Sequence, residues 1–152
     1  MPRAPMSIAR TPIPAPCLVY GLLGWIPFLG PPVIAWAEPG VKLWALQSQA
    51  LYAALILSFL GGARWGLAIA GPGPDARRIG LSMLPTLAGL ALLLLPADQR
   101  ALQLAGLASA LIAQGVWDQI SAKPPQWYPR LRLILTIGAT LGLVAGAGLA
   151  HG

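Results

Sequence analysis

Long apolar blocks, separated by short stretches of proline, glycine and charged residues, make up almost all of the chain. These blocks cover residues 17–37, 43–70, 79–97, 101–117 and 131–150. A helix needs about 20 apolar residues to cross the roughly 30 Å hydrocarbon core of a bilayer, and about 17 is the lower limit. The pattern therefore predicts an all-α integral membrane bundle of five transmembrane helices. The loops are too short for a separate domain, so we expect one domain over residues 17–150.

Proline shapes the beginning of the chain. Residues 1–16 hold five prolines together with Arg3 and Arg10, which predicts an extended arm at the membrane surface. A signal peptide is the alternative, because the arginines could form its basic end and Ala-Trp-Ala at 35–37 resembles a cleavage site. The apolar region 17–37 exceeds the usual 7–15 residues of such peptides and contains three prolines. We therefore expect a kinked first transmembrane helix.

Composition agrees with a lipid environment. The chain is 57% hydrophobic and 9% charged, with a mean hydropathy of +0.70, whereas soluble domains carry about 25% charged residues. The net charge of +6 forms no patch or stripe, so we expect no nucleic-acid partner.

The basic residues divide unequally between the two sides of a five-helix topology. One side would hold Arg3, Arg10, Arg77, Arg78, Lys123, Arg130 and Arg132, and the other only Lys42 and Arg100. Because cytoplasmic loops accumulate Lys and Arg, this predicts a cytoplasmic N-terminus and an external C-terminus.

Arg64 is a charge within an apolar stretch, residues 53–66. A charge at the centre of a bilayer costs about 3 kcal/mol on insertion scales. The segments 43–70 and 101–117 run in the same direction, so Arg64 and Asp118 should meet at the cytoplasmic face. We predict an ion pair between them, with Gln114 as a second partner of Arg64. Two other readings stay open: Arg64 reaches lipid phosphates, or it binds an anionic ligand.

Other side chains could join this cluster. Leu102, Gly106, Ala110, Gln114 and Asp118 recur every four residues and predict one small, partly polar face on the fourth helix. Trp65 and Trp117 each neighbour a member of the predicted pair and could stack on the guanidinium.

Glycines at four-residue spacing mark two helices. They are Gly62 and Gly66 beside Arg64, and Gly138, Gly142 and Gly146 in the last segment. Small residues at this spacing let helix backbones approach closely in lipid. We expect packing inside the bundle, with a homo-oligomeric or partner-subunit face as the alternative.

Residues for catalysis are absent from the sequence. Cys17 and His151 are the single cysteine and histidine, and no carboxylate lies within an apolar block. We therefore expect no enzyme, metal site or cofactor. The expected function is a small accessory or assembly subunit that contacts the lipid bilayer and a larger membrane complex or itself. The alternative is a small transporter, or a protein that binds an anionic lipid or solute through Arg64.

Several short motifs resemble one family. They are GWIPF at 24–28, YAALILSFLGGARWG at 52–66, Leu84-Pro85, Trp117-Asp118 and WYPRLR at 127–132. Together they resemble the multi-pass membrane family whose eukaryotic members are called transmembrane protein 69, over about residues 18–148. The stretch SFLGG-x-RWG is the most specific part. The resemblance implies a bacterial inner-membrane or mitochondrial protein and supports five helices, but it implies no activity. Abundant Ala, Gly, Pro and Arg with only two lysines suggest GC-rich coding, so we expect a bacterial inner membrane.

Overall fold

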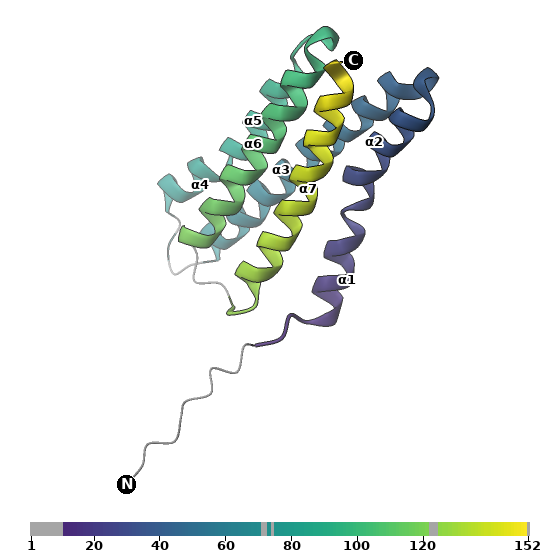
Figure 1. The fold of residues 1–152 in the computed structure, drawn as a ribbon. Helices are drawn as coiled ribbons and strands as arrows, with labels where there is room; N and C mark the ends of the chain where they lie inside the picture. Colours follow the sequence, from purple (N-terminus) through teal and green to yellow (C-terminus); the bar gives the residue numbers. More distant parts are fainter. Residues whose placement is uncertain (1–10, 71–72, 74, 122–124, 152) are drawn as a thin grey trace.

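A computed structural model describes residues 11–70, 73, 75–121 and 125–151, and all regular structure in these residues is helical (Figure 1). The predicted arm lies mostly outside the described residues. The α-helices are α1 (Ala15–Leu23), α2 (Ile26–Ala37), α3 (Lys42–Ile69), α4 (Ala76–Ser82), α5 (Leu84–Leu93), α6 (Arg100–Ser121) and α7 (Tyr128–His151). Short 3₁₀ turns, η1 (Pro39–Val41) and η2 (Ala97–Gln99), precede α3 and α6.

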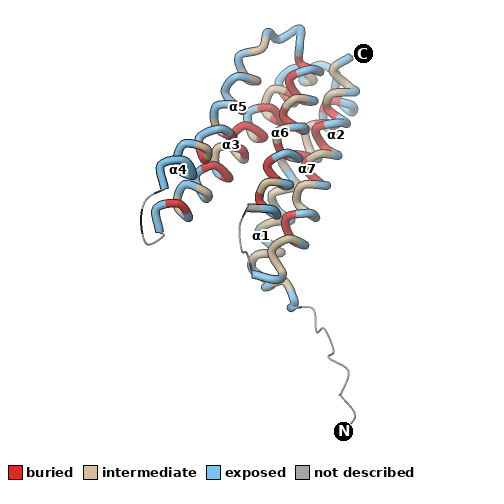
Figure 2. The backbone as a smooth tube through the Cα atoms, turned by 90° about the vertical axis from the view of Figure 1, so that its left-hand side faces the viewer, coloured by how far each residue is buried: buried red, intermediate tan, exposed pale blue. Residues whose placement is uncertain are grey.

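The helices run back and forth between two ends of a bundle (Figure 1). At the lower end of that view α3 and α6 finish, and α1, α4 and α7 begin. At the upper end α2 turns into α3, α5 turns into α6, and α7 finishes. Helix α6 packs most extensively against α7 and also contacts α3 and α5. The buried residues therefore lie along the facing sides of the long helices (Figure 2).

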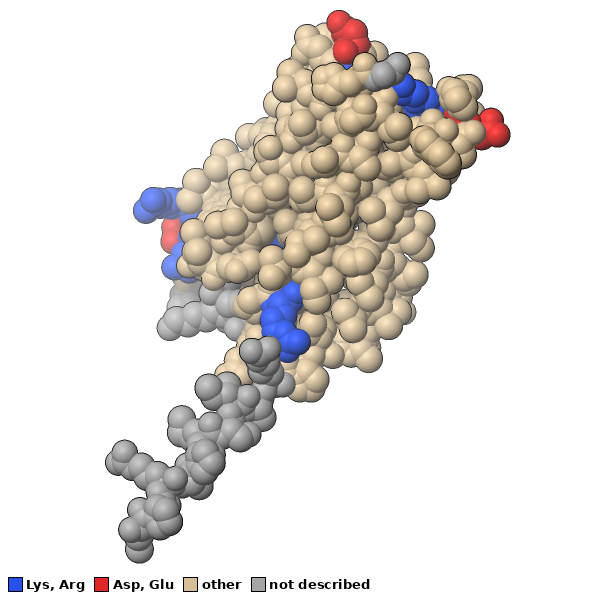
Figure 3. All heavy atoms as spheres, viewed as in Figure 1, with Lys and Arg blue, Asp and Glu red and all other residues tan. Residues whose placement is uncertain are grey.

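Four helical stretches are long and apolar enough to cross a membrane: Ala15–Ala37, Pro39–Ile69, Ala76–Leu93 and Tyr128–His151. They correspond to four of the five predicted segments. The fifth segment, 101–117, forms α6, which is not among them because its 22 residues include polar side chains throughout. Charged atoms lie near both ends of the face in Figure 3, and the surface between them is uncharged. The fold is thus an all-α membrane bundle with four candidate membrane-spanning helices.

The first segment is broken as well as kinked. Helix α1 ends at Leu23 and α2 begins at Ile26, with Pro27 in the first turn of α2. Proline has no backbone N–H, so it cannot donate to the carbonyl four residues earlier and is best accommodated in a first turn. The predicted kink is confirmed, and it lies at the start of α2.

A glutamine from α3 repairs the hydrogen bonding of α2. Pro32 lies inside α2 and leaves the Phe28 carbonyl without its helical donor. The fully buried Gln49 supplies one, because its Nε2 donates to Phe28 O at 2.7 Å and to Gly142 O at 2.8 Å. The Tyr52 hydroxyl likewise donates to Gly24 O, at 3.3 Å, where α1 breaks. Helix α3 therefore holds the broken first segment in place.

The third segment is also two helices. Helices α4 and α5 meet at Met83, and Pro85 lies in the first turn of α5. Asp75 caps α4, since its Oδ1 accepts from the backbone N–H groups of Arg77 and Arg78 at 3.0 and 3.2 Å. This agrees with the capping role expected for an aspartate at the start of a helix.

The glycines of α7 face the inside of the bundle. Gly138, Gly142 and Gly146 are all buried. A β-carbon at Gly138 would overlap the indole of Trp25, and one at Gly142 would overlap the carbonyl oxygen of Phe28. These glycines let α7 approach α2 and α3, so internal packing accounts for them.

The glycine pair of α3 is placed differently. A β-carbon at Gly62 or Gly66 would meet nothing within 4 Å in the described chain. The neighbouring Gly61 makes the close contact instead, because a β-carbon there would lie 2.6 Å from the carbonyl oxygen of Ser82. The approach of α3 to the α4–α5 junction therefore depends on Gly61, one residue before the pair that the spacing indicated.

Candidate functional site

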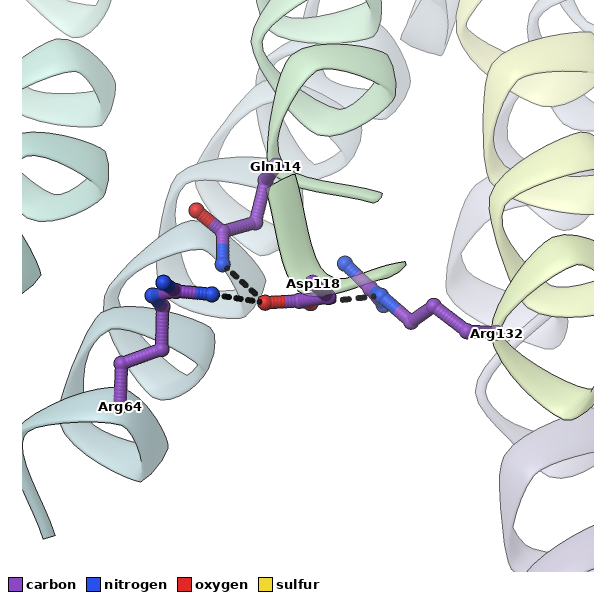
Figure 4. A network of polar contacts seen from close by, with 4 residues as sticks. All are labelled: Arg64, Gln114, Asp118 and Arg132. Carbon is purple, nitrogen blue, oxygen red and sulfur yellow. Dashed lines mark hydrogen bonds and ion pairs between the residues drawn. The ribbon is translucent and has the colours of Figure 1, made fainter. Parts of the chain in front are cut away.

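Three helices bring polar side chains together near the lower end of the bundle (Figure 4). Arg64 comes from α3, Gln114 and Asp118 come from α6, and Arg132 comes from α7. Helices α3 and α6 run in the same direction, and α7 starts soon after α6 ends. The order of the segments therefore sets these four residues at one level.

Asp118 is the centre of this cluster. Its Oδ1 accepts from Arg64 Nη1 at 2.8 Å and from Gln114 Nε2 at 2.8 Å, and its Oδ2 accepts from Arg132 Nε at 3.0 Å. The side chains of Asp118 and Arg132 are 7% and 8% exposed, and that of Arg64 is 18% exposed. Charge-assisted hydrogen bonds of this kind are the strong ones. One carboxylate thus ties α3, α6 and α7 together.

An aromatic ring completes the surroundings of Arg64. Its guanidinium carbon lies 3.6 Å from the centre of the Trp117 ring, which is within the range of a cation–π contact. Trp65 is 42% exposed, and no contact with this cluster is found for it in the described chain. The structure therefore brings together Arg64, Gln114, Trp117 and Asp118, and it leaves Trp65 at the surface.

The four-residue row predicted on α6 does not stay on one face. Gln114 and Asp118 are buried, whereas Leu102 is 58% exposed. A helix has 3.6 residues per turn, so each step of four residues drifts by about 40°. Over the four steps from Leu102 to Asp118 the row turns to the other side of the helix.

Arg132 is the member of the cluster that sequence reasoning missed. It was counted only as a topological charge at the start of the last helix. A usable signal existed, since a short linker between two antiparallel helices sets Asp118 and Arg132 at the same level. The cluster then holds two guanidiniums against one carboxylate. Nη2 of Arg132 is also buried and has no hydrogen-bond partner in the described part of the chain.

A cavity of about 1040 Å³ lies beside this cluster. Its polar wall includes Arg64, Trp117, Asp118 and Tyr128, and its other walls are formed by α3 and α4. Arg77 and Arg78 of α4 also line it, together with their capping residue Asp75.

The chemical character of the cavity is cationic. Three arginines line it against two aspartates, and each aspartate already has cationic or N–H partners. No three histidine, cysteine, aspartate or glutamate side chains of the described residues lie close enough together to hold a metal ion. The arrangement can bind an anion.

The all-α fold, with its four candidate membrane-spanning helices and its buried arginine–aspartate cluster, defines a helix-bundle integral membrane protein. The chain belongs to the family described as "Protein of unknown function (DUF3429)", which matches residues 13–148.

Two relatives carry the same name. The chain is 37% identical over 139 residues to "Transmembrane protein 69" of Xenopus tropicalis and 30% identical over 138 residues to "Transmembrane protein 69" of Mus musculus. Each match covers 86% of this chain but only 53% and 55% of the relatives, so the chain spans about half of their length. No solved structure matches the chain. The resemblance found in the motifs is therefore confirmed.

Proposed function

We propose that this protein is a non-enzymatic membrane protein that binds an anionic group, of a lipid or of a solute, in the cavity beside Arg64. The observation that carries this proposal is the lining of the cavity by Arg64, Arg77 and Arg78. Both aspartates at the cavity are engaged by these arginines, by Arg132 or by backbone N–H groups. A positive surplus remains, and an anion would neutralise it.

The test is the thermal stability of the purified protein in nonionic detergent. Glycerol phosphate and an anionic phospholipid would be added separately, each against NaCl of equal ionic strength. We expect at least one of them to raise the midpoint of unfolding above the NaCl control, because a ligand that binds the folded state stabilises it. An unchanged midpoint with both ligands contradicts the proposal.

The proposed topology has α6 as a fifth membrane span. Polar residues of α6, such as Gln103 and Asp118, are buried, whereas Leu102, Val116 and Ile120 are more than half exposed. A helix that turns apolar side chains outward and polar ones inward is suited to contact with lipid. This pattern compensates for the lower hydropathy of α6.

The proposed orientation has the lower end in the cytoplasm of a bacterium, with the protein in the inner membrane. Arg77, Arg78, Arg130 and Arg132 belong to that end, and Arg3, Arg10 and Lys123, which were assigned to it, lie outside the described residues. Lys42 and Arg100 belong to the upper end. The positive-inside rule supports this orientation.

Cysteine labelling on intact cells tests both points. In a Cys17→Ser background, a membrane-impermeant maleimide should label Asp98→Cys from outside and Gln126→Cys only after permeabilisation. If both positions are labelled from the same side, α6 does not cross the membrane between them. Labelling of Gln126→Cys alone contradicts the orientation.

A second candidate function is that of an accessory or assembly subunit. The observation that favours it is the open surface at Gly62 and Gly66, where β-carbons would meet nothing in the described chain, beside the exposed Phe59. A partner helix could pack there at short distance. Purification in mild detergent tests it: a stoichiometric partner, or a dimer, that is lost in Gly62→Leu supports this role. A monomer without partners contradicts it.

A further inference from the structure

The cavity has an apolar side as well as a cationic one. Leu60, Leu67 and Ala68 of α3 and Leu81 of α4 line it. Both helices belong to stretches that are long and apolar enough to cross a membrane, so this wall is suited to contact with lipid. Burying apolar surface gains about 25 cal/mol per Å², which a small soluble anion cannot exploit. A ligand with an apolar chain can.

The cationic side lies toward the lower end of the bundle. Arg77 and Arg78 occupy the first turn of α4, where Figure 3 shows basic and acidic atoms gathered over that helix. Asp75 Oδ2 lies 3.1 Å from Arg78 Nε, so Arg78 is partly neutralised. Arg77 is exposed and forms no ion pair within the described residues. Arg77 is therefore the rim cation best able to engage a ligand.

Arg64 forms the inner cation of the cavity. It shares Asp118 with Arg132, so two guanidinium groups face one carboxylate at low exposure. Guanidinium groups match phosphate oxygens in planar, bidentate geometry. Basic pockets between membrane helices on the cytoplasmic side are suited to lipid headgroups. The volume of about 1040 Å³ is slightly above the roughly 300–1,000 Å³ typical of small-ligand sites, which leaves room for a headgroup and part of a chain.

We infer that the cavity is a site for an anionic glycerophospholipid. Its phosphate lies between Arg64 and Arg77, and one acyl chain follows the apolar wall formed by α3 and α4. This inference rests on the proposed function and names the class of the ligand. The phosphate neutralises the surplus charge of the Asp118 cluster without displacing Asp118.

The experiment compares three probes on the purified full chain in nonionic detergent: dioctanoyl phosphatidylglycerol, dioctanoyl phosphatidylcholine and glycerol 3-phosphate. We expect phosphatidylglycerol to raise the midpoint of unfolding by about 5–10 °C at a hundredfold excess over its dissociation constant. Phosphatidylcholine lacks the net negative charge, and glycerol phosphate lacks the chains. Both should need at least about tenfold higher concentrations for the same rise in midpoint, since a charge-assisted contact or a partly buried chain changes the affinity by about that factor.

Two matched variants assign the effect to the cavity. Arg77→Gln should raise the half-saturating concentration of phosphatidylglycerol about tenfold, because one charge-assisted contact is lost. Arg130→Gln removes the same charge from an exposed arginine that does not line the cavity, and it should leave binding unchanged. Arg77 is exposed, so its variant should unfold at the same midpoint as the parent chain without ligand.

The outcomes separate the two proposals. Equal effects of phosphatidylglycerol and phosphatidylcholine, or equal losses in Arg77→Gln and Arg130→Gln, overturn the lipid site. Glycerol phosphate that binds as well as phosphatidylglycerol leaves the anion-binding function standing and overturns the lipid inference. No stabilisation above the NaCl control by any of the three overturns both.

Discussion

Replacing Asp118 with asparagine removes the carboxylate that Arg64 and Arg132 share, while it nearly preserves the shape of the side chain. The two guanidiniums then remain near each other without the anion between them. We predict a large loss of stability, whose size depends on how deeply the cluster is buried. This substitution is the most direct test of whether Asp118 holds α3, α6 and α7 together.

The magnitude follows from exposure. Asp118 and Arg132 are almost fully buried, and removing one partner of such a pair costs about 3–5 kcal/mol because an unpaired charge stays behind. Arg64 is 18% exposed and can turn toward water or headgroups, so leaving Arg64 without Asp118 costs less than leaving Arg132 without it. We expect Asp118→Asn to lower the free energy of unfolding by about 4 kcal/mol.

A double-mutant cycle in mixed detergent–SDS micelles measures this, with tryptophan fluorescence as the signal. Asp118→Asn, Arg132→Gln and their combination form one cycle, and Asp118→Asn with Arg64→Gln forms the other. In the Asp118→Asn background, replacing an arginine should lower the free energy of unfolding only slightly or even raise it. Each cycle should therefore depart from additivity by more than about 1 kcal/mol. Additive losses, within about 0.5 kcal/mol, refute the shared ion pair.

Two further predictions concern the contacts around α2. Gly142→Val should lower the unfolding free energy by about 1–3 kcal/mol through overlap with the Phe28 carbonyl. Gly148→Val is the control, because Gly148 has open space around it in the described chain, and it should change the unfolding free energy by less than about 1 kcal/mol. Equal losses in the same unfolding assay would contradict this packing. Gln49→Leu should cost about 1–3 kcal/mol because the Phe28 carbonyl loses its donor, and Pro32→Ala in the same chain should recover much of it by restoring a backbone N–H. An absence of rescue would show that Gln49 acts in another way.

Much of the architecture was predictable from the sequence. In lipid every backbone polar group must be satisfied within the chain, so an apolar block of sufficient length has to be helical. The apolar blocks therefore predicted the helices. The alternating direction of successive helices predicted that Arg64 and Asp118 lie at the same end of the bundle. The three prolines of residues 17–37 likewise predicted the kink of the first segment.

The rotation of each helix about its axis was not predictable. In a soluble helix the apolar stripe identifies the buried side, but here the outer surface is apolar too, with Phe59 and Ile120 both at least 70% exposed. The interval of four residues therefore indicated Gly62 where Gly61 makes the contact. It also assigned Leu102 to the face of Asp118 although the row drifts around α6.

The sequence by itself determined which segments are helical and at which end of the bundle each charge lies, because both follow from the length and order of the apolar blocks. The tertiary structure decided which partners these groups take. Only packing shows that Arg132 joins Asp118 and that Gln49 serves the carbonyl left open by Pro32. The tertiary structure also forms the cavity beside Arg64, since an empty space depends on how close neighbouring helices come.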